Sequence, residues 1–145
     1  MEPSEDQEEI ARLLPLTPAV FHILLALAGG ERHGYGVMGE IARATDGQMR
    51  IGPGTLYRSI KQMLAAGLIA ESDERPDPAL DDERRRYYRL APFGRRVAQA
   101  EAERLARLVR AARARRLLAE SGDGQTGAGG IEGAPGTQGA LGGLA

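Results

Sequence analysis

The first strong pattern in the chain is a run from residue 19 to residue 28 in which nearly every side chain is hydrophobic. Such a run predicts a helix that is buried on all sides. Thr17 offers an N-cap oxygen and Pro18 suits a first helical turn, while Gly29-Gly30 stops the helix. We therefore expect this stretch to form the central helix of the core.

Two further stretches are hydrophobic on one side only, which predicts helices that cover the core and face solvent. The first reaches about Ala44, and its inward positions are Val37, Met38 and Ile41. The second begins at Pro53 and is ended by Gly67, because glycine accepts the left-handed cap conformation. Its inward positions are Leu56, Ile60, Met63 and Leu64.

Polar and apolar residues then alternate in two short segments, 68–72 and 86–90, with Tyr88 and Leu90 on one face of the second. This alternation predicts two strands that pair with each other. The intervening residues 73–85 contain two prolines and many charges, so we expect a mobile hairpin loop there, called the wing below.

The last pattern predicts a long helix from Pro92 to about Leu118, since no residue between them breaks it. Apolar positions step by three and four along it, with Leu108 beside them, as in a seam between two helices: Ala98, Ala102, Leu105, Val109 and Ala112. At the standard rise this helix would be about 40 Å long, more than so small a domain can cover. We expect it to form a dimer interface; the alternative is a helix folded back on its own domain.

The two ends of the chain differ from its middle. The first residues are acidic and include a capping box, Ser4-x-x-Gln7, which predicts a short helix through Leu14 that Pro15 stops. The last residues are rich in glycine and lack apolar periodicity, so we expect them to be disordered. Four segments are therefore predicted: 1–15, a domain at 16–91, the long helix at 92–118, and a tail at 119–145.

The net charge of −1 hides a strong asymmetry. All 19 Lys and Arg residues lie between residues 12 and 119, together with 12 of the 20 acidic residues, which gives this part a formal charge of +7. A basic domain is typical of nucleic-acid binders. No apolar run is long enough to cross a membrane and the N-terminus does not resemble a signal sequence, so we expect a cytoplasmic protein that binds no membrane.

The polar side of the predicted helix at Pro53 carries hydroxyl, amide and cationic groups but no carboxylate. Thr55, Arg58, Ser59 and Gln62 are expected to be exposed there, with Tyr57 and Lys61 on its flank. A helix face without acids suits a polyanion such as DNA. The alternative is an ordinary solvated surface helix.

Five short motifs occur in this chain in one order: Leu16-Thr17-Pro18, His33-Gly34-Tyr35, Gly52-Pro53-Gly54-Thr55-Leu56-Tyr57, Gly67-Leu68-Ile69 and Arg86-Tyr87-Tyr88-Arg89-Leu90. Over residues 16–118 they resemble the PadR family of bacterial transcriptional regulators. The resemblance implies a mainly α winged-helix fold: a three-helix helix-turn-helix core, a two-stranded hairpin wing and a long C-terminal dimerisation helix. It also implies a homodimer that binds an inverted repeat in double-stranded DNA and most often represses transcription, with a small-molecule effector that can relieve repression.

In this family the Pro-Gly-Thr-Leu-Tyr motif opens the recognition helix, so Gly54, Thr55, Leu56 and Tyr57 carry over by position. The full set of expected DNA-contacting residues adds Tyr35, for which a core position is an equal alternative, and the cations of the wing. The set is Tyr35, Gly54, Thr55, Tyr57, Arg58, Ser59, Lys61, Gln62, Arg84, Arg85 and Arg86.

The sequence departs from the family pattern in two places. Ala91 stands where the family commonly has a threonine that caps the last helix, and an alanine cannot supply that oxygen. The wing is acidic around Asp73-Glu74 and Asp81-Asp82-Glu83, which argues against close approach of the whole wing to DNA. An acidic wing also motivates the alternative function, a winged helix that binds another protein instead of a DNA site.

The sequence offers no catalytic constellation and no cofactor site, so we do not expect an enzyme. Cysteine is absent, and two histidines alone do not make a metal site. His22 lies in the apolar helix and is expected in the core or an interface. His33 precedes the second helix, where a cap or a backbone hydrogen bond is expected.

Overall fold

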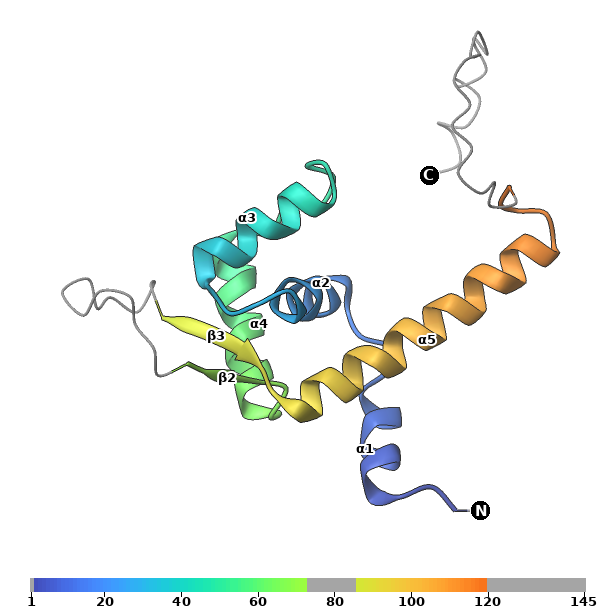
Figure 1. Cartoon of the computed structure of the whole chain (residues 1–145), viewed down its shortest axis with the longest axis horizontal. Helices are drawn as coiled ribbons and strands as arrows, with labels where there is room; N and C mark the ends of the chain where they lie inside the picture. Colours follow the sequence, from blue (N-terminus) through green and yellow to red (C-terminus); the bar gives the residue numbers. More distant parts are fainter. Residues whose placement is uncertain (1, 73–85, 120–145) are drawn as a thin grey trace, which may run out of the picture. The chain divides into compact units, whose positions relative to one another are not determined.

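The structure, a computed structural model, describes residues 2–72 and 86–119. Helices and strands follow one another along these residues (Figure 1) in the order α1 (Glu5–Leu13), α2 (Pro18–Ala28), β1 (Arg32–His33), α3 (Gly34–Ala44), α4 (Pro53–Ala65), β2 (Ile69–Glu71), β3 (Tyr87–Leu90) and α5 (Pro92–Ala114). The predicted helices and the predicted hairpin strands are all present. No helix in the described ranges has both the length and the apolar content needed to span a bilayer.

Three of the helices begin at a side-chain cap. The hydroxyl of Ser4 accepts the Gln7 N–H while the Gln7 side chain accepts the Ser4 N–H, so the predicted capping box forms. Thr17 Oγ1 accepts the N–H of Val20 at 3.2 Å and starts α2. His33 Nδ1 accepts the N–H of Gly36 at 3.0 Å, which confirms the expected capping role of this histidine at α3. These caps satisfy N–H groups that a helix start otherwise leaves unpaired.

The sheet has three strands in the order β1-β3-β2, all antiparallel. The prediction of a two-stranded hairpin was incomplete, because Arg32 and His33 pair with Tyr88 and Tyr87 on the other edge of β3. The His33 and Tyr87 rings meet edge to face with centroids 5.4 Å apart. Two residues are too few to show an alternating pattern, so β1 was not predicted from the sequence.

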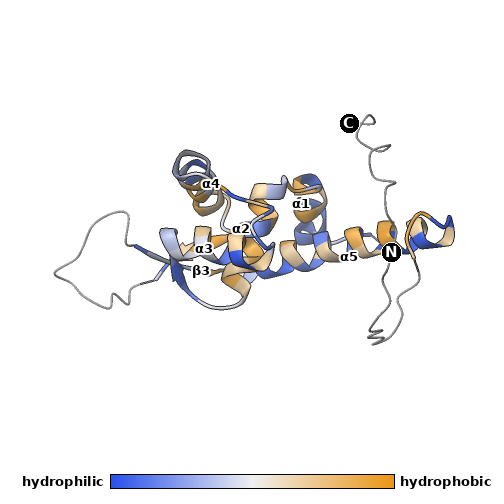
Figure 2. Cartoon of the chain, turned by 90° about the horizontal axis from the view of Figure 1, so that it is seen from above, coloured by the Kyte–Doolittle hydropathy of each residue, from blue (hydrophilic) through white to orange (hydrophobic). Residues whose placement is uncertain are grey.

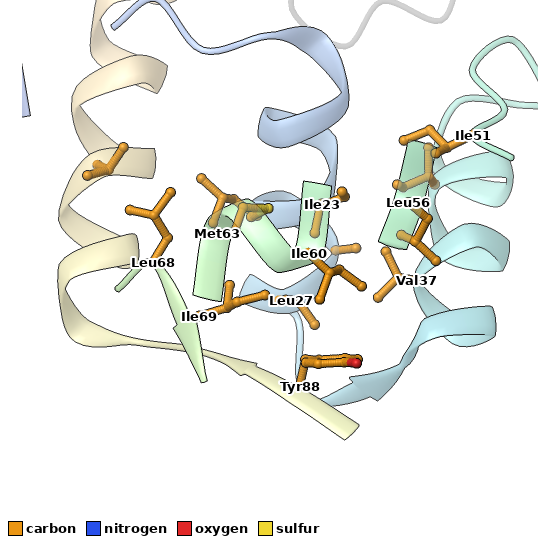
Figure 3. Close-up of a cluster of buried hydrophobic side chains, with 14 residues drawn as sticks. Ile23, Leu27, Val37, Ile51, Leu56, Ile60, Met63, Leu68, Ile69 and Tyr88 are labelled. Carbon is orange, nitrogen blue, oxygen red and sulfur yellow. The ribbon is translucent and has the colours of Figure 1, made fainter. Parts of the chain in front are cut away.

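The core lies between α2, α3, α4 and the inner face of the sheet. Figure 3 shows Tyr88 of β3 and Ile69 of β2 beside core side chains from α2 and α4. The largest fully buried side chains come from α2, α3, α4 and α5: Ile23, Leu24, Val37, Ile41, Leu56, Met63, Val97 and Glu101. The buried face of α4 therefore fixes the direction in which its polar face points.

The chain divides into two compact units, Met1–Leu108 and Val109–Ala145, with the boundary inside α5. Within the first unit, α5 buries Gly94, Val97 and Glu101. Glu101 Oε2 accepts the N–H of Leu16 at 3.1 Å. Asp6 and Arg96 form an ion pair at 2.9 Å, so both α1 and the linker after it are tied to α5.

The prediction that the last helix continues to about Leu118 was wrong by four residues, since α5 ends at Ala114. Arg116 adopts φ 61°, and the N–H of Leu117 bonds back to the carbonyl of Ala112 at 2.8 Å. This is the hydrogen-bond pattern of a Schellman motif, with arginine in the position that glycine usually takes. This helix end could not be predicted, because the motif forms here without a helix-breaking residue.

Candidate nucleic-acid interface

The exposed side of α4 carries five of the eleven predicted contact residues. Thr55, Arg58, Lys61 and Gln62 are exposed, as is Gly54 in the first turn. The placement of Ser59 on this side was wrong, because its residue surface is only 7% exposed. Ser59 lies three residues after Leu56 and four before Met63, so the 3.6-residue period turns it toward the core.

Tyr57 is half-buried and packs against the core cluster rather than standing clear on the flank of α4. Its ring lies over the backbone of Gly34: a Cβ on Gly34 would come within 2.9 Å of Tyr57 Cζ. Gly34 is buried at the start of α3. Tyr57 therefore joins the two helices of the helix-turn-helix, and Gly34 leaves the room that the ring needs.

The cations around α4 have no carboxylate beside them. Residues 47–70 contain neither Asp nor Glu. Among the described residues, no ion pair or hydrogen bond involves the side chain of Arg58 or Lys61. Unpaired cations on an acid-free surface generate the positive potential that attracts phosphate groups.

A third cation, Arg50, was not among the predicted contact residues and lies exposed two residues before the N-cap Gly52. Its Nη2 lies near the turn after α3, 3.4 Å from the position that a Cβ on Gly47 would take. It also lacks an ion pair within the described part of the chain. Arg50 could have been predicted as a contact residue, because it lies in the acid-free stretch just before the predicted helix.

The acidic residue of α3 is neutralised by its neighbours. Arg43 binds Glu40 through two hydrogen bonds, of 2.6 and 3.1 Å, and Arg32 Nη2 lies 3.8 Å from Glu40 Oε1. The hydrogen bonds from Arg43 lower the pKa of the Glu40 carboxyl, and Glu40 in turn raises the pKa of Arg43. Glu40 therefore presents no isolated negative charge next to the helix-turn-helix.

Tyr35 lies in the first turn of α3 with 45% of its surface exposed. The alternative of a core aromatic is thereby excluded. An exposed phenol at this end of α3 can donate a hydrogen bond to a backbone phosphate, as the first helix of a helix-turn-helix does.

Of the three predicted arginines at 84–86, Arg84 and Arg85 lie outside the described residues, as does the acidic part of the wing. Arg86 is half-buried, and its Nη1 lies 3.5 Å from Glu71 Oε1 on the neighbouring strand. Arg89 is exposed and donates from Nη1 to the carbonyl of Glu71 at 3.1 Å. The arginines at the described end of the hairpin are therefore engaged with β2.

The predicted seam of α5 is only partly covered. Ala98 is half-buried and packs against the core, so it belongs to the contacts of its own domain. Leu105 and Ala112 are half-buried, and Ala102 is exposed. Leu108 and Val109 are 54% and 39% exposed, and Figure 2 shows hydrophobic and hydrophilic residues interleaved along α5. The first part of the helix thus follows the alternative of packing on its own domain, while apolar side chains stay accessible farther along.

The model of the PadR-like family of transcriptional regulators matches residues 23–100, which is more than half of the chain. A 37.1 kDa protein of transposon TN4556 from Streptomyces fradiae is 34% identical over 85 residues, which cover 59% of this chain. This chain spans only 22% of the length of that protein.

Several solved structures share the fold. A transcriptional regulator from Clostridium thermocellum matches with a TM-score of 0.56 and 22% identity, over 81% of this chain and 100% of that one. A PadR family regulator from Clostridium difficile matches with a TM-score of 0.53 and 20% identity, over 68% and 97%. BpsR of Bordetella bronchiseptica, whose DNA binding is regulated by 6-hydroxynicotinic acid, matches with a TM-score of 0.52 and 26% identity, over 72% and 75%.

Proposed function

Since this chain belongs to the PadR-like family of transcriptional regulators, we propose that it binds an inverted-repeat operator as a homodimer and represses the genes it controls. The observation that carries the proposal is the polar face of α4. Arg58, Lys61, Thr55 and Gln62 are exposed there in a stretch without a single carboxylate. Such a face fits the major groove of DNA, whose phosphates and base edges it can reach.

The start of α4 supports the same reading. Gly52 is its N-cap and provides no side-chain hydrogen bond, in contrast to Ser4, Thr17 and His33 at α1, α2 and α3. Pro53 occupies the first turn, and a Cβ on Gly54 would meet nothing within 4 Å. The N–H groups of this turn are therefore accessible to a phosphate oxygen, which the helix dipole also favours.

The proposed dimer contact involves the exposed apolar positions of α5. Ala102, Leu108 and Val109 are exposed, and burying the part of the leucine and valine side chains that is still exposed against a second copy contributes about 1 kcal/mol each. Two recognition helices related by a two-fold axis would read half-sites about 34 Å apart. A palindromic operator follows from that symmetry.

An effector that releases the DNA completes the proposal. The DNA binding of BpsR, which shares the fold at 26% identity, is regulated by 6-hydroxynicotinic acid. Thermal unfolding of the full chain in the presence of small aromatic acids would identify a ligand by a raised Tm. A true effector would also lower DNA affinity at the same concentration.

The decisive experiment is electrophoretic retardation of DNA fragments that flank the gene for this protein, with the full chain at fixed salt. We expect one fragment with an inverted repeat to be retarded, and Arg58→Ala to weaken that complex while leaving the dimer intact. Retention of a protein partner without enrichment of any DNA fragment would instead support the protein-interaction alternative. The acidic wing that motivates this alternative lies outside the described residues.

A further inference from the structure

Arg58 and Gln62 form a pair on the outward side of α4. They are four residues apart, so they lie about 40° apart around the helix axis and about 6 Å apart along it. Both side chains are exposed, and neither takes part in a hydrogen bond or ion pair among the described residues. Both are therefore available to an external ligand without the loss of an internal hydrogen bond or ion pair.

The two side chains carry complementary base-reading chemistry. A guanidinium can donate two hydrogen bonds to O6 and N7 of guanine, and a carboxamide can pair with N6 and N7 of adenine. Contacts with cytosine N4 are best accepted by a carboxylate, and residues 47–70 contain none. The exposed face of α4 is therefore equipped for purines.

The neighbouring side chains have different properties. Ser59 is buried and cannot reach a base edge. Lys61 lies on the other side of Arg58, toward the half-buried Tyr57, and an ammonium acts as a point charge that suits phosphate. Thr55 can bond to any base, so it adds little discrimination. Arg58 and Gln62 remain as the residues that distinguish one base pair from another.

We propose that each operator half-site contains a guanine read by Arg58 and an adenine read by Gln62, about two base pairs from it. The spacing follows from the rise of about 6 Å between the two residues and the rise of about 3.4 Å per base pair. The proposal rests on the proposed function, since it requires α4 to lie in the major groove. In this proposal Arg58 and Gln62 determine the base specificity, and Lys61 and Arg50 contact phosphate groups.

The test begins with selection of binding sites from random duplexes by the full chain. We expect the enriched half-site to contain a guanine and an adenine at that spacing. Replacing this guanine with 7-deazaguanine removes the N7 acceptor and should weaken binding about tenfold. Arg58→Ala loses the bond to O6 as well, so it should bind the natural site at least as weakly, and it should lose nothing more on the modified site. Gln62→Ala should show the same behaviour with 7-deazaadenine.

The outcomes separate this proposal from the proposed function. If no sequence is enriched, the function itself fails. If sites are enriched but wild-type protein binds 7-deazaguanine DNA as well as natural DNA at every guanine, DNA binding stands and the assignment to Arg58 is overturned. Because this last comparison uses the wild-type chain, it tests the assignment to Arg58 even if Arg58→Ala cannot be purified. Arg50→Ala serves as the matched control, with equal weakening on natural and modified sites.

Discussion

The ring of Tyr57 in α4 packs on the backbone of Gly34 at the start of α3. A Cβ on Gly34 would come within 2.9 Å of Tyr57 Cζ and 3.1 Å of Cε1, with the phenolic oxygen nearer still. Two of the sequence motifs, His33-Gly34-Tyr35 and the segment that ends in Tyr57, therefore meet in space. The contact sets the distance between the two helices that are expected to face DNA.

Gly34→Ala should lower the free energy of unfolding by about 1–3 kcal/mol, because the added methyl group overpacks the contact with Tyr57. Urea unfolding followed by circular dichroism measures the change. Gly39→Ala is the matched control on the same helix, since a Cβ there meets nothing within 4 Å. It should leave stability unchanged or raise it by about 0.5–1 kcal/mol.

The phenolic oxygen is the nearest atom, so Tyr57→Phe should recover part of the stability lost in Gly34→Ala. A double-mutant cycle gives the coupling between the two sites. Strict additivity of the two substitutions would contradict a direct contact between Gly34 and Tyr57.

Gly94→Ala should be more damaging than Gly34→Ala, with a loss of about 3 kcal/mol. A Cβ on Gly94 would approach the backbone of Leu68, with the carbonyl carbon at 2.8 Å, and backbone cannot move aside as a side chain can. The Leu68 carbonyl also accepts the Ala91 N–H at 3.0 Å, which holds the start of α5 in place. A Tm within one degree of the wild type would refute this close packing.

Glu101 should stabilise the fold only above the pH at which a glutamate ordinarily titrates. Hydrogen bonds from Arg104 lower the pKa of the Glu101 carboxyl, burial opposes this, and the Leu16 N–H adds to the lowering. A pKa that is lower in the folded than in the unfolded chain favours folding above the unfolded value, which is about 4.3, and this benefit disappears as pH falls through the folded value.

Glu101→Gln should therefore lose about 1–2 kcal/mol at pH 7, and the difference from wild type should shrink below about pH 4. Thermal unfolding between pH 3 and 7 checks this expectation. Glu103→Gln removes the same charge from an exposed site on the same helix and should have little effect at any pH. A wild-type advantage at position 101 that did not depend on pH would show that the charge of Glu101 is irrelevant.

Arg50→Ala should weaken DNA binding for all sequences alike, because an exposed guanidinium before α4 is placed to contact phosphate. The slope of log K against log salt should become less steep by about 1. Fluorescence anisotropy with the operator at several salt concentrations measures it. Arg12→Ala removes the same charge from α1, where it should alter the slope less; equal changes would indicate only a general charge effect.

Leu108→Glu should convert the proposed dimer to a monomer without unfolding the domain, since Leu108 is 54% exposed and makes few contacts within its own chain. Sedimentation velocity reports the mass and circular dichroism the fold. Arg107→Glu places the same side chain on a different face of α5 and should remain dimeric. Dimers that persist in Leu108→Glu would remove this residue from the proposed interface.

The sequence correctly predicted the helices and strands that have clear capping residues or an alternating pattern. Thr17, Pro18 and the Ser4 capping box defined the starts of α2 and α1, and alternation defined β2 and β3. It failed at β1, whose two residues pair with a distant strand, and at the end of α5, where a local hydrogen-bond motif forms without a breaker residue.

The same limit applies to the candidate interface. The helical period correctly placed Arg58 and Gln62 on the exposed side of α4. Ser59 was assigned to that side because it is polar, although its position in the helix points it toward the core. The contact between the Tyr57 ring and Gly34 was not predicted, because the two residues are 23 positions apart and no local pattern joins them. The family resemblance, confirmed over residues 23–100, supplied the fold class but not these contacts.

The hydrogen bond between Leu16 and Glu101 joins residues 85 positions apart, so it sets an order of events during protein synthesis. At about 5–20 residues per second, a ribosome needs roughly 4–17 s to add the residues between them. During that interval α2 to α4 can already pack around their own core. Glu101 has not yet been synthesised, so the N–H of Leu16 lacks its carboxylate acceptor. The helix-turn-helix can thus fold before α1 packs against α5.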